Sequence, residues 1–321
     1  MTIAIPDDYQ HAIKTLDCFQ LLKEHTVRTF HEYETDEEQL AEWFQEAEIL
    51  VLTRTRTKIT DTLLQRLPKL KLISQTGKNP GHIDVAACTK HGVAVMEGRG
   101  NPIATAELTW ALIMNGLRQL PQAIAGMKEG LWQINIGSRV YGKTIGIWGY
   151  GKIGKRIANY AKAFGAEVVV WGSKASRDLA VEHGFQAADN KEAFFKQVDV
   201  VSLHLRLKEA TTHIVKEADL LQMKPTALLV NTSRAALIET NALLNALKAG
   251  RPGFAAIDVY EEEPIFDRGH PLLQSPNVIC TPHLGYVERA GYELYFSIAF
   301  QNVLDFIAGE TSHIANPEVL A

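Results

Sequence analysis

Three glycines have a spacing that suits the binding of a dinucleotide. Gly149, Gly151 and Gly154 form a G-x-G-x-x-G pattern after the apolar run TIGIW and before the helical stretch KRIANYAKAF. In such a turn the first glycine allows the tight bend, the second lets the backbone approach the pyrophosphate, and the third lets helix and strand pack closely. The helix start, with Lys152 and Ile153, supplies amides and a partial positive charge to the phosphates. The strand–turn–helix context favours a dinucleotide site over a structural turn.

The residues beyond these glycines bear on which dinucleotide is bound. Such folds usually place an Asp or Glu about 20 residues further on, where it accepts hydrogen bonds from the ribose 2′-hydroxyl of NAD. This chain has Gly172 there, followed by Ser173, Lys174 and Arg177. The missing carboxylate removes repulsion of a 2′-phosphate, and a hydroxyl with two cations favours one. The sequence therefore favours NADP over NAD. In the alternative interpretation, Lys174 and Arg177 are only the solvated start of a helix.

The elements that must hold these residues alternate along the whole chain. Short, β-rich apolar runs are followed by stretches with helical periodicity, which is typical of parallel sheets wrapped by helices. The runs are apolar on successive residues, as expected of strands covered on both faces. They read TIAI, EILVL, KLIS, VAVM, TIGIWG, EVVVW, DVVSLHL, ALLVN, GFAAIDV and NVICT. Between the two sets, the stretch 101–120, in which Pro102 suits a first helical turn, predicts a long helix rather than a flexible linker.

Composition limits the classes of function. The chain has 321 residues, of which 46% are hydrophobic, and a formal net charge of -4; these values fit a globular protein of about two domains. Interspersed charges of both signs argue against a nucleic-acid surface, and no apolar run approaches the roughly 18 residues of a membrane span. The start, MTIAIPDDYQ, lacks the features of a signal peptide, and Cys18, Cys88 and Cys280 have no metal-like spacing. We therefore expect a cytoplasmic protein without a metal site.

Further motifs follow in a fixed order. VNTSRAALI at 230–238, AAIDVYEEEP at 255–264 and TPHLGY at 281–286 each stand at the end of a predicted strand. Together with GKTIGIWGYGKIG they resemble the D-isomer-specific 2-hydroxyacid dehydrogenases, and the resemblance covers nearly the whole chain. It implies an oxidoreductase that transfers a hydride between NAD(P)H and a small 2-oxo acid or D-2-hydroxy acid.

The resemblance also implies the architecture. The expected α/β fold has two Rossmann-like lobes, each a parallel sheet with helices on both faces, and the active site lies in the cleft. A dinucleotide-binding domain, 99–288, is inserted into a flavodoxin-like substrate domain formed by 1–98 and 289–321. The helical pattern that closes the chain then belongs to the first lobe, which periodicity alone does not tell. The family usually forms a dimer through the nucleotide lobes, so we expect a homodimer.

The same motifs imply catalytic roles. Arg234 in TSRA would hold the substrate carboxylate and polarise its carbonyl, because the rigid fork of its donors suits a planar anion. His283 in TPHLG would give a proton to the carbonyl oxygen as hydride reaches the carbon. Glu263 would accept a hydrogen bond from the imidazole, orient it and favour its charged form. Asp258 would lie near the nicotinamide, whereas His204, outside these motifs, is interpreted as structural or cofactor-adjacent.

A loop of the expected substrate domain departs from the family pattern. QTGKNPGHID at 75–84 occupies the place of a glycine-rich loop whose amides grip the substrate carboxylate. Gly77 is retained, but Lys78 and Asn79 stand where an apolar residue and a glycine are common; their amides can still point at an anion. The Lys78 side chain either adds a charge for a second acidic group or is an exposed lysine without such a duty. Arg54, in LTRTRTKIT, matches a family arginine that reaches the cleft.

Three functions remain open on the sequence. The first is an NADP-preferring reductase of a 2-oxo acid, of glyoxylate or of hydroxypyruvate. The second is an NAD-dependent enzyme similar to phosphoglycerate dehydrogenases, although the chain ends at Ala321 without the regulatory domain that many of them carry. The third is a cofactor-sensing binding module similar to the corepressors that share this fold. Turnover of a panel of 2-oxo acids with NADH and NADPH would separate them.

Overall fold

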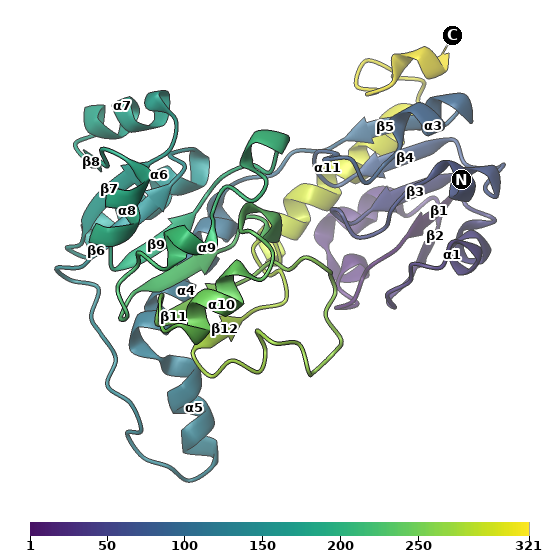
Figure 1. Cartoon of the computed structure of the whole chain (residues 1–321). Coiled ribbons are helices and arrows are strands. Elements are labelled where there is room, and N and C mark those ends of the chain that lie inside the picture. The colour runs from purple at the N-terminus through teal and green to yellow at the C-terminus, as the bar shows by residue number, and fades with distance from the viewer. Residues whose placement is uncertain (321) are drawn as a thin grey trace. The chain divides into compact units, whose positions relative to one another are not determined.

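The chain forms two compact units. The first consists of residues 1–101 and 287–321, and the second of residues 102–286. The computed structural model describes residues 1–320. Each unit contains an all-parallel sheet with helices on both faces, so the α/β fold class predicted from the sequence is confirmed (Figure 1).

The first unit has the strand order β2-β1-β3-β4-β5, which is the flavodoxin-like order. Phe44 and Leu63, from helices α1 and α2, pack on one face of the sheet against Leu50, and α3 joins them there. Helix α11 covers the other face, where the Ser74 hydroxyl donates to the Ala299 carbonyl (2.8 Å). The elements are β1 (Thr2–Ile5), η1 (Ile13–Thr15), η2 (Asp17–Leu22), β2 (Thr26–Thr29), α1 (Glu37–Phe44), β3 (Ile49–Leu52), α2 (Asp61–Gln65), β4 (Leu72–Gln75), α3 (Val85–Lys90), β5 (Ala94–Glu97), α11 (Arg289–Ile307) and η5 (Pro317–Leu320).

The second unit has the order β12-β11-β10-β9-β6-β7-β8, a doubly wound sheet that reverses between β6 and β9. Helices α4, α6 and α7 pack on one face, and α8, α9 and α10 on the other. The elements are α4 (Ile103–Arg118), α5 (Leu120–Lys128), β6 (Thr144–Trp148), α6 (Lys152–Ala163), β7 (Glu167–Trp171), α7 (Lys174–Glu182), β8 (Gln186–Ala187), α8 (Lys191–Gln197), β9 (Val200–Leu203), η3 (Glu209–Thr211), α9 (Glu217–Leu220), β10 (Leu228–Asn231), η4 (Ala235–Leu237), α10 (Ala242–Lys248), β11 (Phe254–Ile257) and β12 (Val278–Cys280).

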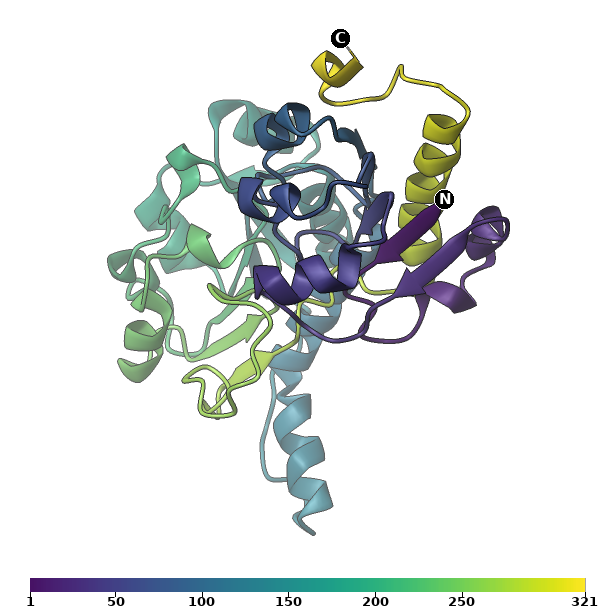
Figure 2. The ribbon, with the colours of Figure 1, turned by 90° about the vertical axis from the view of Figure 1, so that its right-hand side faces the viewer.

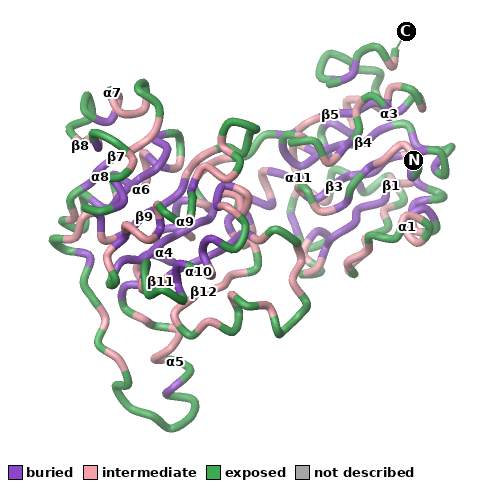
Figure 3. The backbone as a smooth tube through the Cα atoms, viewed as in Figure 1, coloured by how far each residue is buried: buried purple, intermediate pink, exposed green. Residues whose placement is uncertain are grey.

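The central strands are buried along their whole length. Every residue of β3, β4, β9 and β10 is buried (Figure 3). This burial explains why these strands are apolar on successive residues, since helices cover both of their faces. The sheets are therefore rigid platforms, and the loops at their carboxyl edges carry the candidate functional residues.

Helix α5 and the segment after it, residues 120–138, form an arm that projects from the second unit (Figures 1 and 2). Gln119, with φ 52°, separates α5 from α4 within the stretch predicted to be one long helix. The chain then returns along the helix: the Asn135 side-chain amide donates to the Gln119 carbonyl (2.9 Å), and the Ser138 amide donates to the Leu117 carbonyl (2.7 Å). Among residues 1–320, no helix is long and apolar enough to span a membrane.

Candidate active site

The glycine turn lies where the strand order of the second unit reverses. Gly149 follows β6 with φ 101°, and a Cβ on it would lie 2.6 Å from the carbonyl oxygen of His204, which follows β9. A Cβ on Gly154 would lie 2.1 Å from the Gly149 carbonyl oxygen, so only glycine lets α6 approach the turn so closely. Ligands of doubly wound sheets bind outside the carboxyl ends of the strands at such a reversal.

The first turn of α6 leaves its amides open to an anion. Gly151 precedes the helix without a capping side chain, and a Cβ on it would meet no atom of residues 1–320 within 4 Å. The amides of Lys152 and Ile153 begin the helix, where N–H groups lack intrahelical partners and attract negative charge. By contrast, Asp36 and Thr60 cap α1 and α2 with their side chains. The turn therefore fits the pyrophosphate of a dinucleotide.

The start of α7 lies beside the glycine turn. Gly172 follows β7 with φ 146°, and a Cβ on it would lie 3.7 Å from the Gly149 amide nitrogen. Ser173 caps α7, because its hydroxyl oxygen accepts a hydrogen bond from the Ser176 amide (3.3 Å). The residues that the sequence connects with the 2′-position of the ribose are thus adjacent to those connected with the pyrophosphate.

The two cations expected to meet a 2′-phosphate have contacts within the chain. Lys174 Nζ lies 2.6 Å from Asp178 Oδ2 one helical turn away, with both side chains exposed. The Arg177 guanidinium lies over the Trp171 indole, with 4.8 Å between Cζ and the ring centroid. Arg177 Nε is buried and has no hydrogen-bond partner among residues 1–320. Because exposed ion pairs contribute little to stability, Lys174 can exchange Asp178 for a phosphate at little cost.

Glu263 and His283 are in direct contact. His283 Nδ1 lies 2.5 Å from Glu263 Oε2, and the Tyr260 amide donates to Glu263 Oε1 (2.8 Å). The His283 and Glu263 side chains are 17% and 20% exposed, so protein shields most of the pair from water. The imidazole lies edge-on to the Tyr286 ring, with 5.5 Å between the ring centroids. Since the carboxylate engages Nδ1, Nε2 is the nitrogen that can exchange a proton with a substrate.

Asp258 holds the loop that carries His283. Its carboxylate is buried and accepts hydrogen bonds from the Thr281 hydroxyl (2.6 Å), the Leu284 amide (2.7 Å) and the Gly285 amide (2.9 Å). Burial raises the pKa of Asp258 above its ordinary value, although these hydrogen bonds and the nearby His283 oppose the shift. The three donors on both sides of His283 fix the backbone from which the imidazole projects.

Arg234 stands at the neighbouring strand end. It follows β10, and its Nη1 donates to the Ser233 carbonyl (2.6 Å) while its own carbonyl accepts from the Asn231 side chain (2.9 Å). Because β10, β11 and β12 are neighbours in the sheet, Arg234, Asp258 and His283 lie at three consecutive strand ends. The candidate catalytic residues named from the sequence therefore share one edge of the second unit, which the glycine turn also occupies.

Helix α4 contributes hydroxyl groups that the sequence reading missed. The Thr105 hydroxyl donates to the Gly285 carbonyl (2.7 Å), and the Thr109 hydroxyl lies 2.7 Å from the Thr232 hydroxyl in the segment before Arg234. The signal was present in ATAELT, since Thr105 and Thr109 are four residues apart and so share a helix face. These contacts connect α4 to both the Arg234 and the His283 segments.

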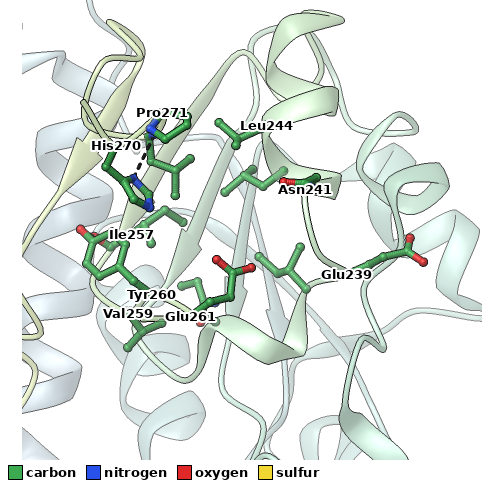
Figure 4. A pocket seen from close by; sticks show the side chains of 14 residues that line it. Glu239, Asn241, Leu244, Ile257, Val259, Tyr260, Glu261, His270 and Pro271 are labelled. Atoms are coloured by element: carbon green, nitrogen blue, oxygen red, sulfur yellow. Dashed lines mark hydrogen bonds between the residues drawn. The ribbon is translucent and has the colours of Figure 1, made fainter. Parts of the chain in front are cut away.

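A cavity of about 170 Å³ adjoins the segment that leads to Glu263 (Figure 4). Figure 4 shows the Glu261 carboxylate turned into the cavity and the Glu239 carboxylate turned away from it. Its walls include both neighbours of Asp258 in the chain and the start of α10. The lining residues are Asn231, Ala235, Ile238, Glu239, Asn241, Leu243, Leu244, Ile257, Val259, Tyr260, Glu261, His270, Pro271 and Leu272. No sequence motif indicated this cavity.

In the first unit, Arg54 lies against the loop after β4. A Cβ on Gly77 would lie 2.5 Å from Arg54 Nη1, so the guanidinium reaches the loop closely at this glycine. The guanidinium also lies over the Tyr295 ring of α11, with 5.1 Å between Cζ and the centroid. The structure thus brings together Arg54 and Gly77, two residues that the sequence connects with the substrate.

Lys78 and Asn79, the other two residues of this prediction, meet a carboxylate of the chain itself. Lys78 Nζ lies 2.7 Å from Glu97 Oε2, and the Asn79 amide donates to Glu97 Oε1 (2.8 Å). The loop therefore offers a substrate anion fewer amides than the sequence predicts. The reason is the pairing of β4 with β5, which places the end of β5 beside the loop.

Known proteins similar to this chain indicate its family. The family model for the D-isomer specific 2-hydroxyacid dehydrogenase, NAD binding domain, matches residues 110–285. A D-3-phosphoglycerate dehydrogenase of Methanocaldococcus jannaschii is 36% identical over 85% of this chain and 52% of its own length. A glyoxylate reductase of Thermococcus litoralis is 35% identical over 88% of this chain and 87% of its own. A crystal structure from Ralstonia solanacearum, described as that of a putative D-3-phosphoglycerate dehydrogenase, shares 52% identity, with a TM-score of 0.98 over 100% of this chain and 98% of that one.

Fold and glycine turn together define a protein with a Rossmann-type dinucleotide-binding domain. The chain spans about half the length of the phosphoglycerate dehydrogenase and most of the length of the glyoxylate reductase. Within that class, it belongs to the D-isomer specific 2-hydroxyacid dehydrogenase family. The family membership that the motifs indicated is thereby confirmed.

Proposed function

We propose that the protein catalyses the NAD(P)H-dependent reduction of a small 2-oxo acid to a D-2-hydroxy acid, and the reverse oxidation. The observation that carries the proposal is the contact between Glu263 and His283 at the sheet edge that also holds the glycine turn. An imidazole held by a carboxylate is a proton donor and acceptor suited to interconverting a carbonyl and a hydroxyl. The names of the two relatives support an acid of this class as substrate.

Each candidate catalytic residue of the second unit has a distinct role in this proposal. When bound, the cofactor supplies or accepts the hydride. His283 Nε2 donates a proton to the carbonyl oxygen during reduction and removes it during oxidation, while Glu263 holds the ring through Nδ1. Arg234 binds the substrate carboxylate through its planar guanidinium. Asp258 keeps the His283 loop in place through its three hydrogen bonds.

The domain assignment extends this proposal. Residues 99–288 bind the dinucleotide, and residues 1–98 with 289–321 bind the substrate. Arg54 supports the latter role, since its guanidinium lies against the loop at Gly77. Lys78 contributes its backbone amide, which has no hydrogen-bond partner among residues 1–320.

We further propose that NADP is the preferred cofactor. The support is the absence of an acidic residue at Gly172 and the grouping of Ser173, Lys174 and Arg177 at one exposed helix start. Two charge-assisted contacts to a 2′-phosphate would favour NADPH over NADH by about tenfold or more. Lys174→Gln combined with Arg177→Gln removes both cations and should abolish the preference. Equal affinities of the unaltered protein for both cofactors would refute it.

The active protein is proposed to be a homodimer in the cytoplasm. The arm supplies the support for the dimer, because large apolar side chains that are half or more exposed are concentrated on it: Ile124, Met127, Leu131, Trp132 and Ile136. Monomeric proteins rarely expose apolar patches of more than a few hundred Å². A second copy of this chain is the partner that would cover them.

A steady-state assay with purified protein tests the reaction. Glyoxylate, hydroxypyruvate, pyruvate and 3-phosphohydroxypyruvate are offered as substrates, each with NADPH and with NADH. Turnover of at least one acid with D stereochemistry in the product supports the proposal, and NADPH should give the higher kcat/KM. Preference for the phosphorylated acid would favour an enzyme like the phosphoglycerate dehydrogenase relative. Cofactor binding without turnover of any acid would favour a binding module and refute the reaction.

A further inference from the structure

Glu97 connects two neighbouring strand ends of the first unit. It is the last residue of β5, and its side chain reaches the loop after β4, which is the adjacent strand. Oε2 lies 2.7 Å from Lys78 Nζ, and Oε1 accepts the Asn79 amide (2.8 Å). The Glu97 side chain is only 22% exposed, although that of Lys78 is 75% exposed. One carboxylate thus satisfies a cation and an amide in successive residues.

The loop is held in place beside this carboxylate. Asn79 Oδ1 accepts the Gly81 amide (2.9 Å), and the Asn79 side-chain amide donates to the Ile83 carbonyl (2.9 Å). The Gly98 amide donates to the Gly77 carbonyl (2.9 Å) from the side of β5. An isolated surface ion pair contributes little to stability. Here the Asn79 amide also holds the Glu97 carboxylate, so the carboxylate stays in position for Lys78.

This arrangement decides what the loop can offer an anion. The Asn79 amide is engaged, and the charge of Lys78 is balanced by Glu97. The Lys78 amide remains, and Arg54 lies close to Gly77. These groups suffice for one carboxylate. A second acidic group near Lys78 would meet the Lys78–Glu97 pair, which has no net charge. The Glu97 carboxylate would repel that group, whereas an unbalanced lysine would attract it.

We propose that Glu97 is a specificity-determining residue, which restricts the enzyme to 2-oxo acids with a single negative charge and disfavours those with a second carboxylate or a phosphate. Its carboxylate takes the position that the second acidic group of a dianionic substrate would need. The inference rests on the proposed function, since it assigns the acid class accepted by the same loop. It therefore predicts that this chain differs in substrate from similar proteins whose names give a phosphorylated substrate, including one that is 52% identical.

Paired substrates test the proposal. We compare kcat/KM for glyoxylate and pyruvate with that for oxaloacetate and 3-phosphohydroxypyruvate, in the unaltered protein and in Glu97→Gln. Glutamine can still accept the Asn79 amide through its carbonyl oxygen, so the loop should keep its shape. Loss of the charge releases Lys78, and the ratio of kcat/KM for the acids with a second acidic group to kcat/KM for the monoanionic acids should rise about tenfold or more.

Two further variants sharpen the comparison. Lys78→Gln combined with Glu97→Gln should abolish the gain, because no cation is then released. Glu46→Gln is the matched control. Glu46 Oε2 lies 2.6 Å from Lys69 Nζ in the same unit, and the two residues precede β3 and β4, at the amino ends of the strands. Loss of this carboxylate should leave the ratio unchanged.

Each outcome decides the assignment. An unaltered protein that prefers acids with a second acidic group would overturn it, as would a Glu97→Gln variant with an unchanged ratio. The first of these results needs no variant, so the test does not depend on the folding of Glu97→Gln. Turnover of monoanionic acids with an unchanged ratio would refute the role of Glu97 while leaving the proposed function intact. Absence of turnover with every acid would refute both.

Discussion

Glu263 carries two hydrogen bonds that a carboxamide cannot replace. One oxygen meets His283 Nδ1 and the other accepts the Tyr260 amide. Glutamine has a single carbonyl oxygen, so Glu263→Gln would turn an N–H group toward one of the two donors. We expect kcat to fall about 10- to 100-fold, because the imidazole is no longer held for proton transfer.

The neighbouring acid provides the control for this prediction. Glu262→Gln removes the same charge from an exposed residue one position earlier and should leave kcat unchanged. Both variants should bind NADPH as the unaltered protein does, since neither residue belongs to the glycine turn. A Glu263→Gln variant with normal kcat in the assay would show that the contact with His283 does not serve the reaction.

His204 makes stability depend on pH. Burial lowers its pKa to about 3, so the folded state keeps the imidazole neutral while the unfolded chain binds a proton below about pH 6.5. Stability should therefore fall as pH falls from about 6.5 toward 3, by up to about 1.4 kcal/mol per pH unit. Burial also lowers the pKa of His82, to about 4, which acts in the same direction.

Urea unfolding at pH 7 and pH 5 measures this effect. His204→Gln removes the titrating group, so the variant should lose about 2 kcal/mol less than the unaltered protein between the two values. The comparison is internal to each protein, so any constant cost of the substitution cancels. Equal losses in both proteins would mean that the folded state accommodates a protonated His204.

Individual residues differ in how far the sequence alone predicts them. Arg234, Glu263 and His283 were named from motifs, and the structure places Glu263 and His283 in contact. The pairing of Glu97 with Lys78 was not foreseen, because 19 positions separate them in the chain and only the adjacency of β4 and β5 joins them. Motifs indicate residues that a family shares, whereas a contact such as that of Glu97 with Lys78 depends on which strands are neighbours and on their register.

At the scale of elements, burial determines what the sequence predicts. Each of the ten apolar runs named from the sequence forms a strand. The edge strands β2 and β8 were missed: β2 alternates exposed and half-buried residues, and β8 is two residues long. Because an edge strand has a solvent side and few neighbours, it needs no continuous apolar run, and its sequence resembles a loop.

In the strand–turn–helix element of β6 and α6, we expect substitutions of two glycines, Gly154 and Gly151, to have different effects. A Cβ on Gly154 would meet the Gly149 carbonyl at 2.1 Å, so Gly154→Ala should lower the free energy of unfolding by about 1–3 kcal/mol. A Cβ on Gly151 meets no atom of residues 1–320 within 4 Å. Gly151→Ala should therefore leave urea unfolding unchanged but weaken NADPH binding about tenfold or more, because the pyrophosphate would approach that backbone. Normal binding by this variant would place the pyrophosphate elsewhere.

For the whole molecule, periodicity shows that a helix has an apolar face but not what that face covers. Helix α11 illustrates the point: its residues pack against β3, β4 and β5, which precede it by some 200 residues. Only the resemblance to a family assigned this helix to the first lobe. The compact units therefore mix the two ends of the chain, and a truncation after residue 286 would uncover one face of the first sheet.

The arm leads to a prediction for the assembled protein. Ile136 is 95% exposed and Trp132 74% exposed, and hydrogen bonds join the arm to the base of its own helix and to the loop at Pro276. A dimer that covers these side chains would remove a large apolar area from water, at about 25 cal/mol per Å². We therefore expect the unaltered protein to have about twice the mass of the 35.6 kDa chain in light scattering after size exclusion.

Charged substitutions test whether the arm forms the interface. Trp132→Glu combined with Ile136→Glu should give a monomer at micromolar concentration, because two carboxylates would have to be buried without partners. Val181→Glu is the matched control, since Val181 is 58% exposed on α7, away from the arm, and its substitution should leave the mass unchanged. A dimer that survives the double substitution would place the interface elsewhere, and an unaltered protein that is monomeric would refute the dimer itself.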